Sequence, residues 1–434
     1  MNFAQGYGSW TAPSLPRPGN PCFSSGPTAK PPGYCMDDLE LFFLKGRSHR
    51  SAAAADQLED LGYRLKSLLQ IPDSYALALI PGSATGAMQT ALWNFLGLRG
   101  VDVWGMDVFS RRWADDVQNS LRLQGVRVFE SPWAQLPDFS KADWMRDQVF
   151  SWCGTSTAVS LDHINWIPDV RTGLSICDAT SAVLCADLPW AKLDVTAFSF
   201  QKGFGGEGGI GVLVLSPKAI EQLKDYTPAW PVPRTMRLKT NKGTLNQKLL
   251  YDAAPLNTLS MLTVADMLVS LSWVEKAGGL DGMLKRVALN QKAVSDAVDK
   301  SPHLSYAVQN PKDRAGGVVC LEVSHPDFLK QSDSGRAQFV TAVQKILEIE
   351  QVAFDLKGHG AEPAHFRLWC GPTVMAADLT AGLGWLSWAV QLVLDRGADA
   401  FLAPALDFKD PEAYKKGIES ENDAKGGKNV AGMA

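Results

Sequence analysis

The strongest chemical signal in the sequence is a lysine and an aspartate that each follow an apolar segment. Lys202 comes directly after 195–200 (VTAFSF) and Gln201, and a glycine-rich run, 203–209, follows it. A lysine that is shielded from solvent can lose its proton and attack a carbonyl carbon. Asp178 ends a second apolar segment, 174–177 (LSIC). The ends of neighbouring parallel strands meet at one edge of a sheet, so we expect the two side chains to lie together there.

This pairing indicates pyridoxal 5'-phosphate (PLP). A carboxylate keeps the pyridine nitrogen of PLP protonated, and a lysine amine holds its aldehyde carbon. Each residue alone also has an ordinary structural explanation. Lys202 could be a solvated lysine beside a hairpin turn, and Asp178 could be a helix N-cap.

A phosphorylated, flat cofactor needs a phosphate site and a ring contact. Residues 83–86 (SATG) lie between an apolar strand, 75–80, and a helical segment, so their N–H groups could bind a phosphate. A plain capped turn has the same pattern, and neither GxxxxGK[ST] nor a strand-following GxGxxG occurs. Trp113 could stack on the ring, although core packing explains most tryptophans in a chain that has 14 of them.

Basic side chains in two places could bind an anionic substrate. The segment 46–51 (GRSHRS) holds Arg47, His49 and Arg50. Arg367 lies within an apolar strand-like segment and therefore needs an anionic partner. Arginine binds phosphate and carboxylate groups bidentately. The alternative for the 46–51 segment is a solvated basic loop.

The elements that would position these residues indicate an α/β protein with two domains. From about residue 36 to 272, short apolar runs alternate with helical patterns, which predicts a mainly parallel sheet. Later residues predict helices and strands of an α+β unit. We expect an N-terminal arm (1–35), a large domain (36–280), a small domain (281–405) and a frayed tail (406–434).

Composition excludes several classes of function. The 434 residues carry a net charge of −4 and no basic block, which argues against a nucleic-acid partner. We find no apolar run long enough for a membrane span. The seven cysteines are scattered without a CxxC pair, so we expect reduced thiols, no metal site and a cytoplasmic location.

Several motifs together resemble the phosphoserine aminotransferase family, in the branch found in archaea and some bacteria. The resemblance covers about residues 20–394 and is carried by the following segments: CFSSGPTAKPPGY (22–34), GRSHRS (46–51), CDATSA (177–182), LDVTAFSFQKGFGGEGG (193–209), YTPAWPVP (226–233), LNTLSML (256–262) and FRLWCG (366–371). It implies a fold-type I, class V, PLP-dependent enzyme. Its fold would be a seven-stranded, mainly parallel sheet plus a smaller C-terminal domain, and it would work as a homodimer with shared active sites.

The resemblance also implies roles for single residues. Lys202 would be the Schiff-base lysine and would move the substrate proton, and Arg367 would bind the substrate α-carboxylate. The cofactor contacts would come from Ala84, Thr85, Trp113, Thr155, Asp178 and Gln201, and from Asn257 and Thr258 of the other subunit. The substrate phosphate would meet His49, Arg50 and His359.

The implied reaction is reversible transamination of O-phospho-L-serine with 2-oxoglutarate, giving 3-phosphohydroxypyruvate and L-glutamate in serine biosynthesis. A second substrate would be 4-phosphohydroxythreonine of vitamin B6 synthesis. Two departures bear on this: Gly360 stands where many members have an arginine for the substrate phosphate, and Leu259 follows Asn257-Thr258 in place of proline. Another class V aminotransferase or lyase, and a PLP-binding protein without catalysis, stay open as alternatives.

Overall fold

A computed structural model describes residues 10–161 and 164–402 of the chain. Its largest element is a seven-stranded sheet in the order β1-β7-β6-β5-β4-β2-β3, in which β7 is antiparallel to both its neighbours and the other neighbouring pairs are parallel. The strands are β1 (Ala76–Pro81), β2 (Val101–Gly105), β3 (Val126–Glu130), β4 (Asp147–Ser151), β5 (Ser175–Asp178), β6 (Val195–Ser199) and β7 (Ile210–Leu215). This confirms the predicted α/β fold class and the mainly parallel sheet.

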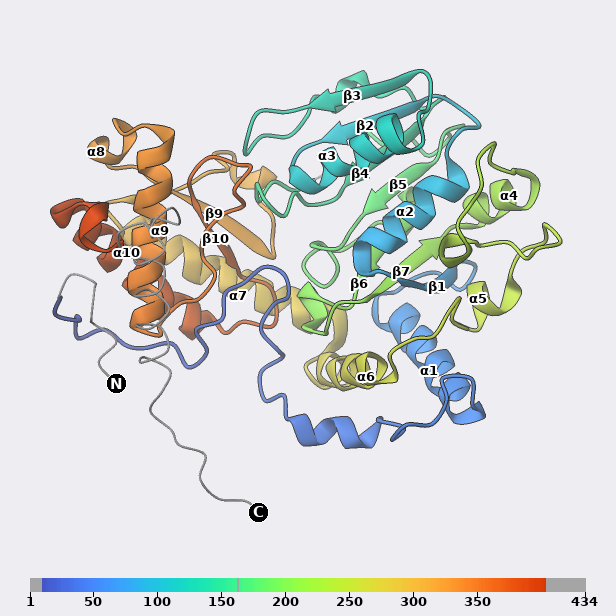
Figure 1. Cartoon of the computed structure of the whole chain (residues 1–434), viewed down its shortest axis with the longest axis horizontal. Helices are drawn as coiled ribbons and strands as arrows, with labels where there is room; N and C mark the ends of the chain where they lie inside the picture. Colours follow the sequence, from blue (N-terminus) through green and yellow to red (C-terminus); the bar gives the residue numbers. More distant parts are fainter. Residues whose placement is uncertain (1–9, 162–163, 403–434) are drawn as a thin grey trace, which may run out of the picture.

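Helices cover both faces of this sheet (Figure 1). One face packs against α2 (Ser83–Phe95), α3 (Val108–Asp115), α4 (Pro217–Asp225) and α5 (Gln247–Tyr251). The opposite face packs against α1 (Ala52–Leu68) and α6 (Met261–Lys276). The strands are apolar on both sides for this reason: in β1, Ala78 and Ile80 enter the first core and Leu77 and Leu79 enter the second.

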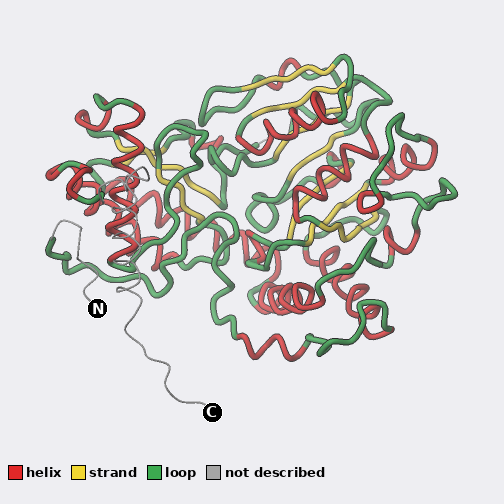
Figure 2. Tube along the Cα trace, viewed as in Figure 1, coloured by secondary structure: helices red, strands yellow, loops and turns green. Residues whose placement is uncertain are grey.

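The C-terminal part has its own antiparallel sheet in the order β10-β9-β8 (Figures 1 and 2). Its elements are α7 (Gly279–Lys300), β8 (Leu304–Tyr306), β9 (Val318–Val323), α8 (Pro326–Leu329), α9 (Asp333–Ile349), β10 (Phe366–Trp369) and α10 (Ala376–Arg396). The expected domain boundary falls near the break between α6 and α7, where Gly278 and Gly279 both have positive φ. The whole of the expected tail, 406–434, lies outside the described residues, which end at residue 402.

Helix α10 is long and apolar enough to cross a membrane by length and composition alone. Half of its apolar window is buried inside the protein, and it packs against α7 and α9. These contacts are typical of a core helix, so the length and composition of α10 are only weak evidence for a membrane span.

The segment that leads from residue 10 to the large sheet connects the two parts of the molecule. Phe23 packs against Gly382 of α10, and its carbonyl accepts a hydrogen bond from the Trp369 N–H at 2.8 Å. Farther along, Lys30 pairs with Asp266 of α6 at 2.8 Å. The described part of the irregular arm expected from the Gly- and Pro-rich sequence is therefore anchored at Phe23 to the C-terminal part and at Lys30 to the large one.

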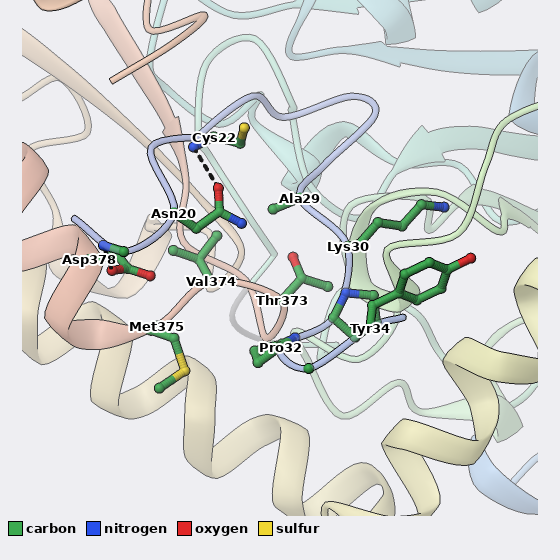
Figure 3. A pocket seen from close by; sticks show the side chains of 13 residues that line it. Asn20, Cys22, Ala29, Lys30, Pro32, Tyr34, Thr373, Val374, Met375 and Asp378 are labelled. Carbon is green, nitrogen blue, oxygen red and sulfur yellow. Dashed lines mark hydrogen bonds between the residues drawn. The ribbon is translucent and has the colours of Figure 1, made fainter. Parts of the chain in front are cut away.

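A pocket of about 300 Å³ lies between this segment and the residues that lead into α10 (Figure 3). Its charged side chains already have partners: Lys30 pairs with Asp266 and Glu207, and Asp378 accepts a hydrogen bond from the Gly19 N–H at 2.6 Å. Neither Lys202 nor Asp178 lines it. We therefore assign the pocket to the packing of the arm and look for chemistry elsewhere.

Candidate active site at the carboxyl edge of the large sheet

The candidate site lies beyond the carboxyl ends of β4, β5 and β6, which are parallel neighbours in the centre of the sheet (Figure 1). Asp178 is the last residue of β5, Lys202 follows β6, and Thr155 lies in the turn that follows β4. The parallel order brings these three connections to the same edge. The residues predicted from strand ends therefore meet as expected.

The Lys202 amine is buried and hydrogen-bonded. Its Nζ lies 3.1 Å from Thr155 Oγ1 and 3.1 Å from Ser181 Oγ, and only 5% of the residue is exposed. Burial, reinforced by the positive charge of Arg367, lowers the pKa of Lys202 to about 8, although Asp178 and Asp107 act in the opposite direction. A sizeable fraction of the amine is therefore neutral near pH 7 to 8, as a nucleophile or base must be.

The backbone around Lys202 is fixed in an unusual conformation. Lys202 has a φ of 71°, in the left-handed region that lysine rarely occupies. Its carbonyl accepts a hydrogen bond from Thr28 Oγ1 at 2.8 Å, and a Cβ at Gly26 would lie 3.9 Å from its Nζ. The N-terminal segment thus closes over the lysine and helps to hold it in this conformation.

The carboxylate of Asp178 presents one free oxygen. Both the N–H and the hydroxyl of Thr180 donate to Oδ1, at 3.0 and 2.6 Å, while Oδ2 accepts no hydrogen bond from any described residue. Burial raises the pKa of Asp178, and the two bonds from Thr180 oppose that shift. The arrangement leaves Oδ2 able to accept a hydrogen bond from a cationic ring nitrogen.

The first turn of α2 offers backbone donors. The N–H groups of Gly82 and Ser83 both donate to the Gly209 carbonyl, at 2.9 and 3.2 Å. The next two, of Ala84 and Thr85, have no acceptor among the described residues. A Cβ at Gly211 would lie 2.2 Å from the Ser83 carbonyl oxygen, so glycine there is what allows this turn to sit directly against β7. Two unpaired N–H groups at a helix N-terminus can bind a phosphate.

The burial of Trp113 argues against the prediction that it stacks on the cofactor ring, and we propose Phe109 for that place instead. Trp113 is 3% exposed and fills the core beneath α3, among Val101, Val103 and Ile176. Phe109, one helical turn earlier on the same face, is partly exposed instead, and the Lys202 amine lies 5.9 Å from its ring centroid. Helix α3 begins near the strand ends and runs away from them. Phe109, in its first turn, therefore reaches the site, and Trp113, one turn later, does not.

This reassignment predicts opposite effects for two substitutions. Phe109→Ala is expected to weaken cofactor binding and catalysis about tenfold with little loss of stability, because a stacked ring contributes ~0.5–1.5 kcal/mol beyond its buried area. Trp113→Ala is expected to cost about 3–5 kcal/mol of stability through the cavity it leaves. Kinetics and thermal unfolding of both variants would check this, with Trp113→Phe as the volume-conserving control. The assignment fails if Trp113→Phe loses activity and Phe109→Ala does not.

Arg367 forms a second wall of the site from the other sheet. It lies in β10, and its Nη1 is buried with no hydrogen-bond partner among the described residues. Burial lowers the pKa of Arg367, while Cys320 and Asp107 act to raise it. A buried guanidinium with an unpaired nitrogen is suited to a carboxylate that arrives with the substrate.

His359 also lies at the site. Its ring stands edge-on to Phe109, with the centroids 6.4 Å apart. Gln201 immediately precedes Lys202 and is partly exposed. Both positions agree with the predicted site.

Four predicted residues are not brought to the site within one chain. His49, Arg50, Asn257 and Thr258 make no hydrogen bond, ion pair or ring contact with Lys202 or with any other site residue named above, and all but the partly buried His49 are exposed. Their roles therefore stay predictions that require a second copy of the chain.

Sequence reasoning missed Ser181, Thr180, Asp107 and Phe109. Ser181 and Thr180 lie within CDATSA, so a run of hydroxyl residues directly after a strand that ends in aspartate was the available signal. Asp107 caps α3 by accepting from the Ser110 N–H at 2.8 Å, and this carboxylate also acts on the pKa of Lys202. Its role as a cap was visible in the sequence, but its distance from Lys202 was not.

Among the residues that the structure describes, no cluster of three or more His, Cys, Asp or Glu side chains is placed to hold a metal ion. All seven cysteines are free thiols, five of them buried. The donor set at the strand ends therefore consists of an amine, carboxylate, hydroxyls and backbone N–H groups, which suits a phosphorylated organic cofactor.

Comparison with known proteins agrees with this geometry. The family profile "Aminotransferase class-V" matches residues 157–361. The chain is 41% identical to a phosphoserine aminotransferase of Methanosarcina barkeri over 87% of this chain and 98% of that protein. A phosphoserine aminotransferase of Nocardioides sp. is 25% identical over 80% of this chain and 89% of that protein.

Solved structures share the fold at low sequence identity. A phosphoserine aminotransferase from Cytophaga hutchinsonii aligns with a TM-score of 0.69 and 18% identity, covering 86% of this chain and 98% of that one. A PLP-bound phosphoserine aminotransferase from Trichomonas vaginalis aligns with a TM-score of 0.67 and 21% identity, covering 86% and 99%. Together with the much closer relative from Methanosarcina, these matches settle the family: the chain belongs to the phosphoserine aminotransferases, within the class V aminotransferases.

Proposed function

We propose that this protein is a PLP-dependent enzyme that transfers the amino group of O-phospho-L-serine to 2-oxoglutarate, reversibly, giving 3-phosphohydroxypyruvate and L-glutamate. The observation that carries the proposal is the meeting of a buried Lys202 amine and a half-free Asp178 carboxylate at one sheet edge. The 41% identity to a phosphoserine aminotransferase supports the choice of substrate. The product places the reaction in serine biosynthesis, and 4-phosphohydroxythreonine is the second substrate that we propose to test.

The residues present fit PLP. Lys202 would hold its aldehyde carbon, Asp178 Oδ2 would accept from its pyridine nitrogen, and Thr155 would bond the ring hydroxyl. The N–H groups of Ala84 and Thr85, with Gln201, would bind its phosphate, and Phe109 would cover the ring. When bound, PLP supplies an electron sink that stabilises negative charge at the substrate Cα.

Lys202 is placed to move the substrate proton. Its Nζ lies beside the hydroxyls of Thr155 and Ser181, which would hold the amine at the site whenever it is not bonded to the cofactor. The pKa of about 8 would let the amine act first as a general base, which takes a proton from the substrate Cα. It would then act as a general acid, which delivers that proton to C4′ of the cofactor. Asp178 stays a buried acceptor throughout, so the ring nitrogen keeps its proton.

Arg367 would orient the substrate. Its buried, unpaired Nη1 would donate to the α-carboxylate, and both substrates of the proposed reaction carry that group. Water is largely absent at this nitrogen, which strengthens the bond.

We also propose a homodimer, because four of the predicted site residues make no contact with the site within one chain. Basic His49 and Arg50 would reach the substrate phosphate of a second copy, and Asn257 and Thr258 its cofactor phosphate. Several large apolar side chains within residues 36–63 and 251–262 are exposed, namely Met36, Leu41, Phe43, Tyr63, Tyr251 and Leu262. Exposed apolar side chains of this size are typical of a surface that a partner covers.

We also propose that the chain works in the cytoplasm and that it divides into the domains predicted above. Support for the location comes from its free cysteines and its relatives' biosynthetic activity. Support for the division comes from the separate C-terminal sheet.

A lyase that uses a reactive cysteine is the weaker candidate. Cys153 and Cys370 lie nearest in sequence to Thr155 and Arg367, and burial raises the pKa of each to about 12. Both thiols are therefore protonated at neutral pH and poorly nucleophilic.

A half-reaction panel tests the proposal. The purified protein, loaded with PLP, would be mixed in a single turnover with phosphoserine, glutamate, alanine, serine and cysteine, and the visible absorbance of the cofactor followed. We expect rapid bleaching with phosphoserine and glutamate and slow bleaching with the other three. No bleaching by any amino acid would favour a binding protein without catalysis, and sulfide release from cysteine would favour the lyase.

A further inference from the structure

Two adjacent arginines of α3 have opposite electrostatic environments. Arg111 Nη1 lies 3.1 Å from Glu362 Oε1, and this carboxylate, which also accepts from Ser156 Oγ at 3.0 Å, has a side chain only 3% exposed. Arg112 is exposed and forms no ion pair with any residue that the structure describes. The charge of Arg111 is therefore already neutralised, and the charge of Arg112 is available.

Arg112 lies beside the ring of Phe109, which is also close to Lys202. Its guanidinium carbon lies 5.3 Å from the Phe109 centroid, while Lys202 Nζ lies 5.9 Å from the same centroid. His359 contacts that ring too, with the centroids 6.4 Å apart. A cation over an exposed aromatic ring gains only ~0.5–1 kcal/mol, so the guanidinium can leave the ring for a stronger partner.

The phosphate group of the proposed substrate needs a cationic side chain near Lys202 and Phe109. Arg367 is committed to the α-carboxylate, so the doubly charged phosphate of phosphoserine needs another donor. Position 360, next to His359, is a glycine and supplies no charge. A guanidinium binds phosphate bidentately and keeps its charge at every physiological pH, which suits Arg112 to this task.

We propose that Arg112, together with His359, binds the phosphate of the substrate side chain and thereby makes the enzyme prefer phosphorylated over apolar amino acids. The proposal rests on the proposed function, because it assigns one part of the substrate of that reaction. Arg112 would act from the same chain as Lys202, in addition to any basic residue of a second copy.

The first test is Arg112→Gln in the PLP-loaded enzyme. We expect the KM for phosphoserine to rise about 10- to 100-fold, the range for a lost charge-assisted hydrogen bond, with kcat nearly unchanged. The rate with alanine, which has no side-chain anion, should stay the same. Arg122→Gln removes the same charge from an exposed arginine outside the site and serves as the matched control.

The second test moves the charge to position 360. A Cβ at Gly360 would meet no atom within 4 Å, and the residue does not have a left-handed φ, so the backbone there accepts a side chain without strain. Adding Gly360→Arg to Arg112→Gln is expected to lower the KM for phosphoserine again by about tenfold. Such a rescue would not follow if Arg112 served only to stabilise α3.

A third measurement does not depend on turnover. Inorganic phosphate would be titrated calorimetrically into the PLP-loaded enzyme, whose cofactor phosphate site is then filled. We expect binding that weakens at least tenfold in Arg112→Gln and is unchanged in Arg122→Gln.

Three results would overturn the proposal: an unchanged KM for phosphoserine in Arg112→Gln, equal losses for phosphoserine and alanine, or phosphate binding that Arg112→Gln leaves intact. A failure of the proposed function would be recognised without any variant. The wild-type enzyme would then prefer an amino acid without a phosphate in the single-turnover panel.

Discussion

Lys202→Ala is expected to abolish transamination, with a loss of at least about 10⁴-fold, because one side chain both holds the cofactor covalently and moves the proton. The visible absorbance of lysine-bound PLP should vanish as well. Lys202→Arg keeps a positive charge but cannot bond the aldehyde, so it is expected to be equally inactive. Absorbance spectra and single-turnover rates with phosphoserine would measure both effects.

Stability separates this catalytic loss from misfolding. The folded protein lowers the pKa of Lys202 to about 8, from an ordinary value of 10.5, so holding the protonated amine is a cost that is fully present below pH 8. The cost fades as pH rises from 8 to 10.5, where the unfolded chain also loses its proton. At pH 7 the cofactor-free Lys202→Ala protein should therefore unfold at the same or a higher temperature. Residual turnover in a well-folded Lys202→Ala protein would refute the assignment.

Arg367→Met is expected to lower kcat/KM about 100-fold for every amino acid substrate, because the buried carboxylate–guanidinium contact is lost. Phosphoserine, glutamate and alanine should suffer alike, since all carry the α-carboxylate. This uniform loss distinguishes Arg367 from Arg112, whose effect should be confined to anionic side chains. Steady-state kinetics with the three substrates would measure it.

The same substitution should not harm the fold. Arg367 Nη1 is buried without a hydrogen-bond partner among the residues that the structure describes, and burial lowers the pKa of the group. Keeping this cation therefore costs the cofactor-free protein stability. Methionine fills a similar volume without a charge, and the melting temperature is expected to stay level or rise by a few degrees. Arg367→Lys is the control that keeps the charge and loses the two-pronged contact. A variant that melts well below the wild type while its kcat/KM is intact would contradict both statements.

The sequence allowed much of the large sheet to be predicted. The strands β1, β5 and β6 correspond to the apolar segments 75–80, 174–177 and 195–200, and each was located within a residue or two. Strand β4 was not, because it begins with Asp147 and Gln148, which look like loop residues but are fully buried. Their partners, Arg99 at 3.4 Å and the Trp104 indole at 2.9 Å, come from distant segments, so only the folded structure explains them.

The candidate site divides in the same way. Lys202 and Asp178 follow strands that were predicted from the sequence, and parallel strands bring such residues together by geometry alone. Thr155 came only from the family resemblance, because β4 was not predicted. Trp113 was proposed because its residue type was visible in the sequence, and Phe109 was not considered because the direction of α3 was not visible. Glu362 was missed entirely, since a glutamate in a polar loop gives no sign that it is buried against Arg111. His49 and Arg50 need a second chain, which no single sequence positions.

The origin of the two anchoring groups sets what the enzyme can accept. Lys202 follows a strand of the large sheet and Arg367 belongs to the small one. If these residues have the roles proposed above, the substrate's amino and carboxylate groups would contact two different sheets. The distance between the two side chains would then have to match the single carbon between those groups in an α-amino acid. A β-amino acid, longer by one methylene, would reach Arg367 only with its amino group displaced, so we expect the packing of the two sheets to disfavour such compounds.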